Sequence, residues 1–154
     1  MSATQNIFGK ILVAVDASPR ASAVFDAAAA LAARFGAELC VLQVITIPPE
    51  FPPAAATTQP DSLPAHMQHV ATENILALWG RAPHVPKTAP IVEIGQPWRC
   101  ILETAKRLDV DLIVLGSHGY QGWDRVWATT AAQVANRADR NVFVVHPRKT
   151  EGAP

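Results

Sequence analysis

The chain has 154 residues, of which 49% are hydrophobic and 17% are charged, and its 13 basic residues balance 13 acidic ones. This length suits one domain with its own core. The zero formal charge argues against a nucleic-acid partner, because neutralising phosphates requires a clustered positive excess. No apolar run approaches the roughly 18 residues of a membrane span. The polar residues 1–10 resemble no secretion signal, so we expect a cytoplasmic protein that does not enter a membrane.

The first half of the chain alternates between strand-like and helix-like patterns. Residues 10–16 form an apolar, β-branched run that is typical of a strand buried on both faces. Ser18-Pro19 predicts the start of a helix, with Phe35 at the end of its apolar face and Gly36 as its stop. Residues 39–45 predict a second strand. Six prolines make residues 48–64 a flexible loop, and residues 65–80 predict a helix with Val70 on its apolar stripe.

The second half continues the alternation. Residues 91–94 predict a third strand. Pro97 predicts the start of a helix, in which apolar residues recur at helical spacing as far as Leu108. Residues 112–115 predict a fourth strand that Gly116 ends, a helix follows over about 124–138, and residues 141–145 predict a fifth strand. Five buried strands alternating with four helices indicate an α/β fold, with an open, twisted parallel sheet covered on both faces. We expect one domain over residues 1–154, with a core of about 8–147 and a polar tail at 148–154.

Two segments are candidates for a ligand site, because ligands of open parallel sheets bind beyond the carboxyl ends of the strands. One is residues 14–18, where Asp16 ends the first strand. The other is the glycine-rich stretch 116–122, whose backbone N–H groups could close on a phosphate at the start of the following helix. Taken alone, such a glycine loop is equally an ordinary tight turn.

Taken together, the chain resembles the universal stress protein family over almost its whole length. The segments that carry the resemblance are 11–18 (ILVAVDAS), 42–44, 95–97, 111–119 (DLIVLGSHG), Arg125 and 142–145. The resemblance implies a Rossmann-like five-stranded sheet with strand order 3-2-1-4-5. It also implies a small stress-response regulator.

In the ATP-binding branch of that family, the phosphate motif is G-x-x-G, nine residues, then G-[ST]. Gly116, Gly119 and Thr130 match it, whereas Thr129 stands where the family has glycine, and a β-branched residue there would weaken phosphate binding. The resemblance implies ATP, with or without Mg²⁺, as the ligand. It also implies a role for each matching position. Asp16 would face the ribose or the metal, and the backbone of Val44 would meet the adenine. Gly116 and Gly119 would approach the phosphates closely, His118 would donate a proton there, and Thr130 would contact a phosphate at the helix start. The plainer alternatives are that Asp16 caps the first helical region and that Val44 is core.

We therefore expect a regulator that binds ATP and forms a homodimer through the strand at 141–145, with a protein partner of unknown identity. The alternative is a nucleotide-free adaptor of the same fold that acts through protein contacts. An enzyme is disfavoured beyond a slow ATPase, because the chain has no P-loop and its glycine loop has no lysine or arginine to clamp phosphates. His66, His69 and Glu73 share one helical face, where a solvated surface is favoured over a metal site.

Overall fold

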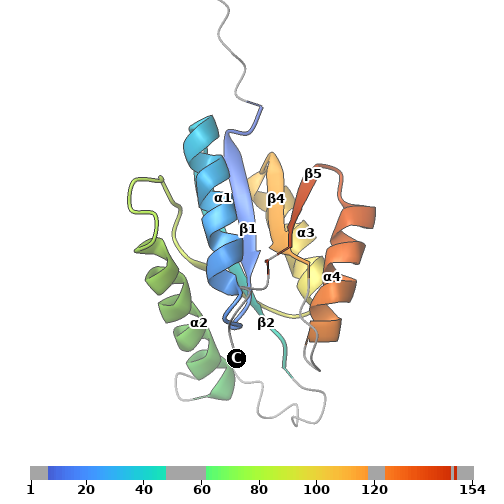
Figure 1. The fold of residues 1–154 in the computed structure, drawn as a ribbon. Helices are drawn as coiled ribbons and strands as arrows, with labels where there is room; N and C mark the ends of the chain where they lie inside the picture. Colours follow the sequence, from blue (N-terminus) through green and yellow to red (C-terminus); the bar gives the residue numbers. More distant parts are fainter. Residues whose placement is uncertain (1–6, 48–61, 118–123, 147, 149–154) are drawn as a thin grey trace, which may run out of the picture.

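A single parallel sheet organises the chain. The computed structural model describes residues 7–47, 62–117, 124–146 and 148, and of residues 124–129 it describes only the backbone. The strands are β1 (Lys10–Val15), β2 (Glu38–Ile45), β3 (Ile91–Ile94), β4 (Leu112–Gly116) and β5 (Asn141–Val145). They pair in parallel in the order β3-β2-β1-β4-β5, which confirms the expected topology. All carboxyl ends of the strands therefore lie at one edge of the sheet, at the arrowheads in Figure 1.

In the described part of the chain, four helices cover the two faces of the sheet. They are α1 (Ala21–Phe35), α2 (Leu63–Trp79), α3 (Pro97–Leu108) and α4 (Asp124–Arg137). Helices α1 and α2 pack on one face, and α3 and α4 pack on the other (Figure 1). Among the described residues, no helix is both long and apolar enough to cross a membrane.

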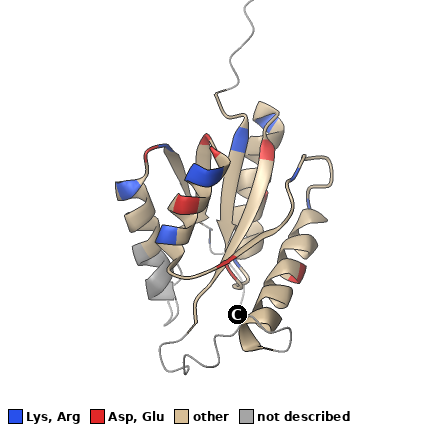
Figure 2. Cartoon of the chain, turned by 180° about the vertical axis from the view of Figure 1, so that it is seen from behind, with Lys and Arg blue, Asp and Glu red and all other residues tan. Residues whose placement is uncertain are grey.

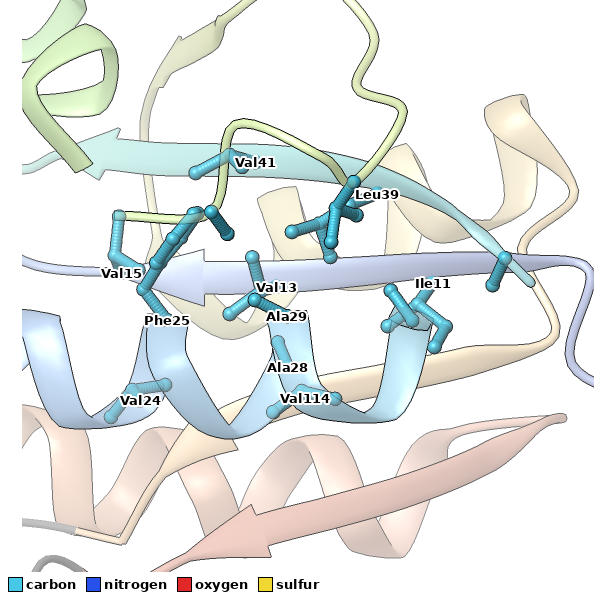
Figure 3. Packing of buried hydrophobic residues seen from close by; sticks show 14 of the residues in the cluster. Ile11, Val13, Val15, Val24, Phe25, Ala28, Ala29, Leu39, Val41 and Val114 are labelled. Carbon is cyan, nitrogen blue, oxygen red and sulfur yellow. The ribbon is translucent and has the colours of Figure 1, made fainter. Parts of the chain in front are cut away.

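The apolar run of β1 builds both halves of the core. Ile11, Val13 and Val15 point toward α1, where they meet Phe25 and Ala28 (Figure 3). The alternate residues Leu12 and Ala14 belong to the cluster that α3 and α4 cover. A strand buried on both faces needs an unbroken apolar run, which explains why this segment does not alternate between apolar and polar residues.

Two helix starts differ from the expectations. Helix α1 begins at Ala21 instead of Ser18-Pro19, and Arg20 precedes it without a side-chain cap. The reason is that the hydroxyl of Ser18 donates to Asp16, so that Ser18 belongs to a turn. Helix α2 begins at Leu63, because Ser62 Oγ accepts a hydrogen bond from Ala65 N and proline is tolerated in a first helical turn. The expected loop 48–64 is therefore too long by two or three residues, and residues 48–61 lie outside the described chain.

Two side chains that were expected in the core are partly exposed. Phe35 is 42% exposed and packs edge-on against Phe8, with ring centroids 4.9 Å apart. Val70 is 43% exposed on α2, whose amino-terminal half extends past the ends of the strands in Figure 1. Apolar residues at helical spacing are therefore buried only along the part of a helix that packs on the sheet.

Polar side chains fix the opposite, amino-terminal edge of the sheet. Asp111 Oδ2 accepts hydrogen bonds from Gly9 N at 2.9 Å and Lys10 N at 3.0 Å, which joins the start of β1 to the start of β4. Arg140 Nη1 donates to Ala105 O at 2.9 Å and Val110 O at 3.0 Å, which ties the end of α3 to the start of β5. These contacts hold β1, β4 and β5 in register and so position their carboxyl ends.

Candidate functional site

The strand register, continued beyond its last pairs, would set Val44, Asp16 and Ser117 in one row at the carboxyl edge. The last β1–β2 pair is Val15 with Gln43, so the next step sets Asp16 beside Val44. The last β1–β4 pair is Ala14 with Leu115, and two further steps set Asp16 beside Ser117. Ser117 N donates to Val145 O at 2.8 Å, which shows that the β4–β5 ladder continues this far. Since the side chains alternate along each strand, the row belongs to the face that α3 and α4 cover.

Asp16 uses one carboxylate oxygen for local structure and leaves the other available. Its Oδ1 accepts hydrogen bonds from Ser18 N at 2.9 Å and Ser18 Oγ at 2.6 Å. Ser18 Oγ in turn accepts from Arg20 N at 3.3 Å. Within the described residues, no hydrogen bond reaches Asp16 Oδ2. Asp16 therefore shapes the turn before α1 and does not cap the helix itself, in contrast to the plainer alternative, and it still offers an acceptor to a ligand.

Val44 and Gly116 both have clear packing roles. Val44 is 8% exposed, lies in the core cluster under α3 and α4, and pairs with Glu93 of β3. A Cβ atom on Gly116 would lie 3.0 Å from Val24 Cγ2, so glycine lets α1 approach β4 closely. Val24 and Val114 belong to the core cluster under α1, and Figure 3 labels both among its side chains. The contact of Val44 with adenine and that of Gly116 with phosphate remain predictions.

Thr130 does not lie at a helix start. Helix α4 begins at Asp124, so Thr130 is six residues inside it, and its side chain is almost fully buried. The expectation of a phosphate contact at the helix start is wrong in this respect, because a backbone N–H inside a helix already bonds within the helix. Only the hydroxyl of Thr130 is suited to such a contact. His118 and Gly119 lie outside the described residues, as does the side chain of Thr129.

A groove opens beside Asp16 on the other face of the sheet. It has a volume of about 370 Å³ and lies between the segment after β1 and α2, with polar walls from Asp16, Ser18, Ser22, Asn74 and Arg81. Arg81 also forms an ion pair with Asp26 at 2.6 Å. Both residues border a second groove of about 500 Å³, whose other walls are three alanines of α1 together with Ala82 and His84. Both volumes suit small ligands, and Asp16 borders the first groove as well as the row.

Ser117 is the residue of the row that the sequence interpretation missed. The residue is 7% exposed and follows directly after β4, and its backbone N–H donates to Val145 O. The signal was available, because Ser117 lies between two proposed site residues and continues the alternation of β4. The motif, however, directs attention to the glycines.

Among the described residues, no metal site is found at the carboxyl edge of the sheet. No group of three or more His, Cys, Asp or Glu side chains there is placed to hold a metal ion. His66, His69 and Glu73 are all exposed, in agreement with a solvated face. Figure 2 shows positive and negative residues interspersed on the view from behind. A magnesium ion at the row would therefore need most of its ligands from a bound phosphate chain or water.

Comparisons with known proteins agree with the fold. The universal stress protein family matches residues 8–146. Universal stress protein A homolog 1 from Coxiella burnetii is 30% identical over 140 residues, which cover 88% of this chain and 94% of that protein. The structure of universal stress protein UspA from Lactobacillus plantarum has a TM-score of 0.67 and 29% identity, and the match covers 90% of this chain and 97% of the other.

Two more distant structures with the same fold contain nucleotides. A universal stress protein in complex with cAMP has a TM-score of 0.67 and 20% identity, with 90% of this chain and 97% of the other covered. The protein from Archaeoglobus fulgidus in complex with dAMP has a TM-score of 0.62 and 18% identity, with 90% and 98% covered. The family match spans residues 8–146, and the alignment with the Coxiella burnetii relative spans most of both chains. The strand order agrees with this match, so the chain belongs to the universal stress protein family.

Proposed function

We propose that the protein binds an adenine nucleotide, ATP first among them, at the carboxyl edge of β1, β2 and β4 and uses it as a regulatory ligand in a stress response. The observation that carries this proposal is the row itself. Strand order reverses between β1 and β4, which is where open parallel sheets bind ligands. There Asp16 Oδ2 accepts no hydrogen bond from the described residues, and Ser117 N is held by Val145 O. The relatives that bind cAMP and dAMP support adenine as the base.

The residues of the row fit a nucleoside better than a bare phosphate. Asp16 is an acceptor with a negative charge, so it suits a sugar hydroxyl and repels a phosphate placed next to it. Val44 offers an apolar surface and a strand backbone for a base. The phosphates would extend toward Gly119 and the hydroxyl of Thr130, as the family motif implies. Mg²⁺ would be held chiefly through those phosphates.

Turnover of ATP should be slow or absent. Phosphoryl transfer needs a cationic clamp and an oriented attacking group. The row itself holds Asp16, Val44 and Ser117, none of which is cationic. Steady hydrolysis near the typical enzyme rate of roughly ten per second would contradict the regulatory function.

Calorimetry with ATP and magnesium tests the proposal on the whole chain. We expect binding in the micromolar range and a loss of about tenfold for Asp16→Asn, because the substitution removes a charged acceptor. Asp26→Asn is the matched control, since Asp26 is an exposed carboxylate on α1 that pairs with Arg81. Absence of binding by the folded protein at millimolar ATP would refute nucleotide binding and favour the adaptor alternative.

We further propose that two copies associate through β5. This strand is at an edge of the sheet, and its Phe143 is 45% exposed. An apolar edge strand with unpaired backbone groups favours pairing with a second copy about a two-fold axis. Light scattering should give about twice the 16.5 kDa chain mass. Phe143→Lys should shift the mass toward one chain, whereas Ile94→Lys on the opposite edge strand β3 should not. A single-chain mass for the unmodified protein would refute the dimer.

A further inference from the structure

We propose that Trp98, Arg99 and Arg137 bind an acidic segment of a protein partner, on the face of the molecule that α3 and α4 cover. We call these three residues the arginine–tryptophan cluster. The nucleotide row includes none of them, and the proposal does not depend on nucleotide binding.

The first observation is that arginines from two helices meet at one aromatic ring. Trp98 lies in the first turn of α3, and its side chain packs against the core cluster under α3 and α4. Arg137 Cζ, from the last turn of α4, lies 4.6 Å from the centroid of the indole ring, and Arg99 Cζ lies 5.6 Å from it. The two helices lie side by side on this face (Figure 1). The ring therefore holds two positive charges that come from different helices.

The second observation is that neither arginine is neutralised within the described residues. Both are exposed, and no described carboxylate forms an ion pair with Arg99 or Arg137. Arg137 Nε donates to the neutral amide oxygen of Gln133 at 3.1 Å. By contrast, Arg107 on the same helix as Arg99 pairs with Glu93 at 3.1 Å. The two arginines of the cluster therefore keep most of their donors for a partner.

The third observation is a further donor without an acceptor at the same place. Trp98 Nε1 is buried and has no hydrogen-bond partner within the described residues. An indole N–H and a guanidinium group can only donate hydrogen bonds. The cluster therefore consists of donors alone, which an anion with several acceptor oxygens complements. A carboxylate matches the fork of donors on a guanidinium group.

The surroundings of the cluster favour a protein partner over other anions. A single exposed ion pair contributes little, so a small free anion would bind weakly. A nucleic acid or an anionic membrane needs a broad positive area, whereas the charges of this chain balance and Glu103 lies one turn from Arg99. Trp and Arg are enriched at the centres of protein interfaces, and stacking on the ring orders the guanidinium groups before binding. A segment with several Asp or Glu side chains can contact both arginines at once.

Fluorescence anisotropy of a dye-labelled octaglutamate peptide, titrated at low salt with the whole chain, tests the proposal. We expect saturable binding that Arg99→Gln and Arg137→Gln each weaken about three- to fivefold, and that the double variant weakens about tenfold. Arg107→Gln is the matched control, because it removes the same charge from an arginine that already pairs with Glu93. It should weaken binding less than about twofold. Trp98→Leu, which keeps both charges, should weaken binding about as much as the loss of one arginine, because the ring no longer orders them.

Thermal unfolding separates recognition from folding. Arg137→Gln should melt earlier, because it removes a contact between α3 and α4, whereas Arg99→Gln should not, since its contact lies within α3. A loss of peptide binding that both variants share therefore reports recognition and not stability. Circular dichroism confirms that each variant is folded before it is titrated.

Several results would overturn the proposal. Losses as large for Arg107→Gln as for the cluster variants would show attraction to the overall charge alone, and the folded, unmodified protein might fail to bind at millimolar peptide. Tighter binding of an RNA octanucleotide, lost in the same variants, would reassign the cluster to nucleic acid, and displacement of the peptide by an equal concentration of inorganic phosphate would reassign it to small anions. The ATP affinity of Arg99→Gln and Arg137→Gln should be unchanged. A loss of ATP affinity in both variants would instead assign these arginines to the nucleotide.

Discussion

Gly116→Ala separates the packing role of this glycine from a phosphate role. The added methyl would lie 3.0 Å from Val24 Cγ2, closer than ordinary van der Waals contact. Val24 is 5% exposed and β-branched in a helix, so it has one preferred rotamer and cannot turn away. Overpacking costs about 1–3 kcal/mol, while replacing glycine by alanine in a strand recovers about 0.5–1 kcal/mol. We expect a net loss of about 1–2 kcal/mol in the free energy of unfolding.

Urea unfolding followed by tryptophan fluorescence measures this loss, and Val24→Ala provides the control. That variant alone should cost about 2 kcal/mol through lost packing. In its background, however, Gly116→Ala should cost nothing or stabilise the protein, because the methyl then fills the space. An undiminished cost of Gly116→Ala in the Val24→Ala background would refute the packing argument. So would unchanged stability of Gly116→Ala combined with lost ATP binding, which would assign the glycine to the phosphate.

Three further predictions concern other parts of the fold. Arg140→Ala should lower the free energy of unfolding by about 1–2 kcal/mol, because it removes the Arg140 donor from the carbonyl of Val110 and one of several donors from the carbonyl of Ala105; unchanged urea unfolding would contradict this. The hydrogen bonds from Arg81 lower the pKa of Asp26 from its ordinary value of 3.8, so this pair should stabilise the fold above that pH and cease to do so as the pH falls below it. An Arg81→Gln variant should accordingly lose its small stability difference at low pH, and a difference that grows there would contradict the sign. Burial raises the pKa of the Cys40 thiol, so a disulfide reagent at pH 8 should modify Cys40 only after unfolding; rapid labelling of Cys40 in the folded Cys100→Ser variant would count against its burial.

The strands were predictable because burial on both faces leaves a strong mark in the sequence. The fifth strand has its expected bounds, Asn141–Val145, and the first ends one residue early, at Val15. The helix starts were less predictable, because several polar side chains compete for the same role. Ser18 has the character of a helix cap, yet its nearest acceptor is the carboxylate of Asp16 two residues before it. Ser62, which was assigned to a loop, caps α2 instead.

The candidate site was predictable as a place and less so as a set of residues. Asp16 and Val44 follow from the rule that ligands bind at the carboxyl ends of parallel strands, and the register sets them side by side. Ser117 could be recognised only from its place directly after β4, which the glycine motif does not single out. The position of Thr130 inside α4 depends on where that helix begins, which helical periodicity fixes only to within a few residues.

The most direct test of nucleotide binding at the carboxyl edge is a titration of ¹⁵N-labelled protein with ATP, followed by backbone amide shifts. We predict saturable changes centred on Asp16, Val44 and Ser117. The amides of Asn74 and His84, which line the grooves on the α1 and α2 face, should move much less. Changes at Asn74 and His84 without changes at Val44 and Ser117, or no changes at millimolar ATP, would contradict the account.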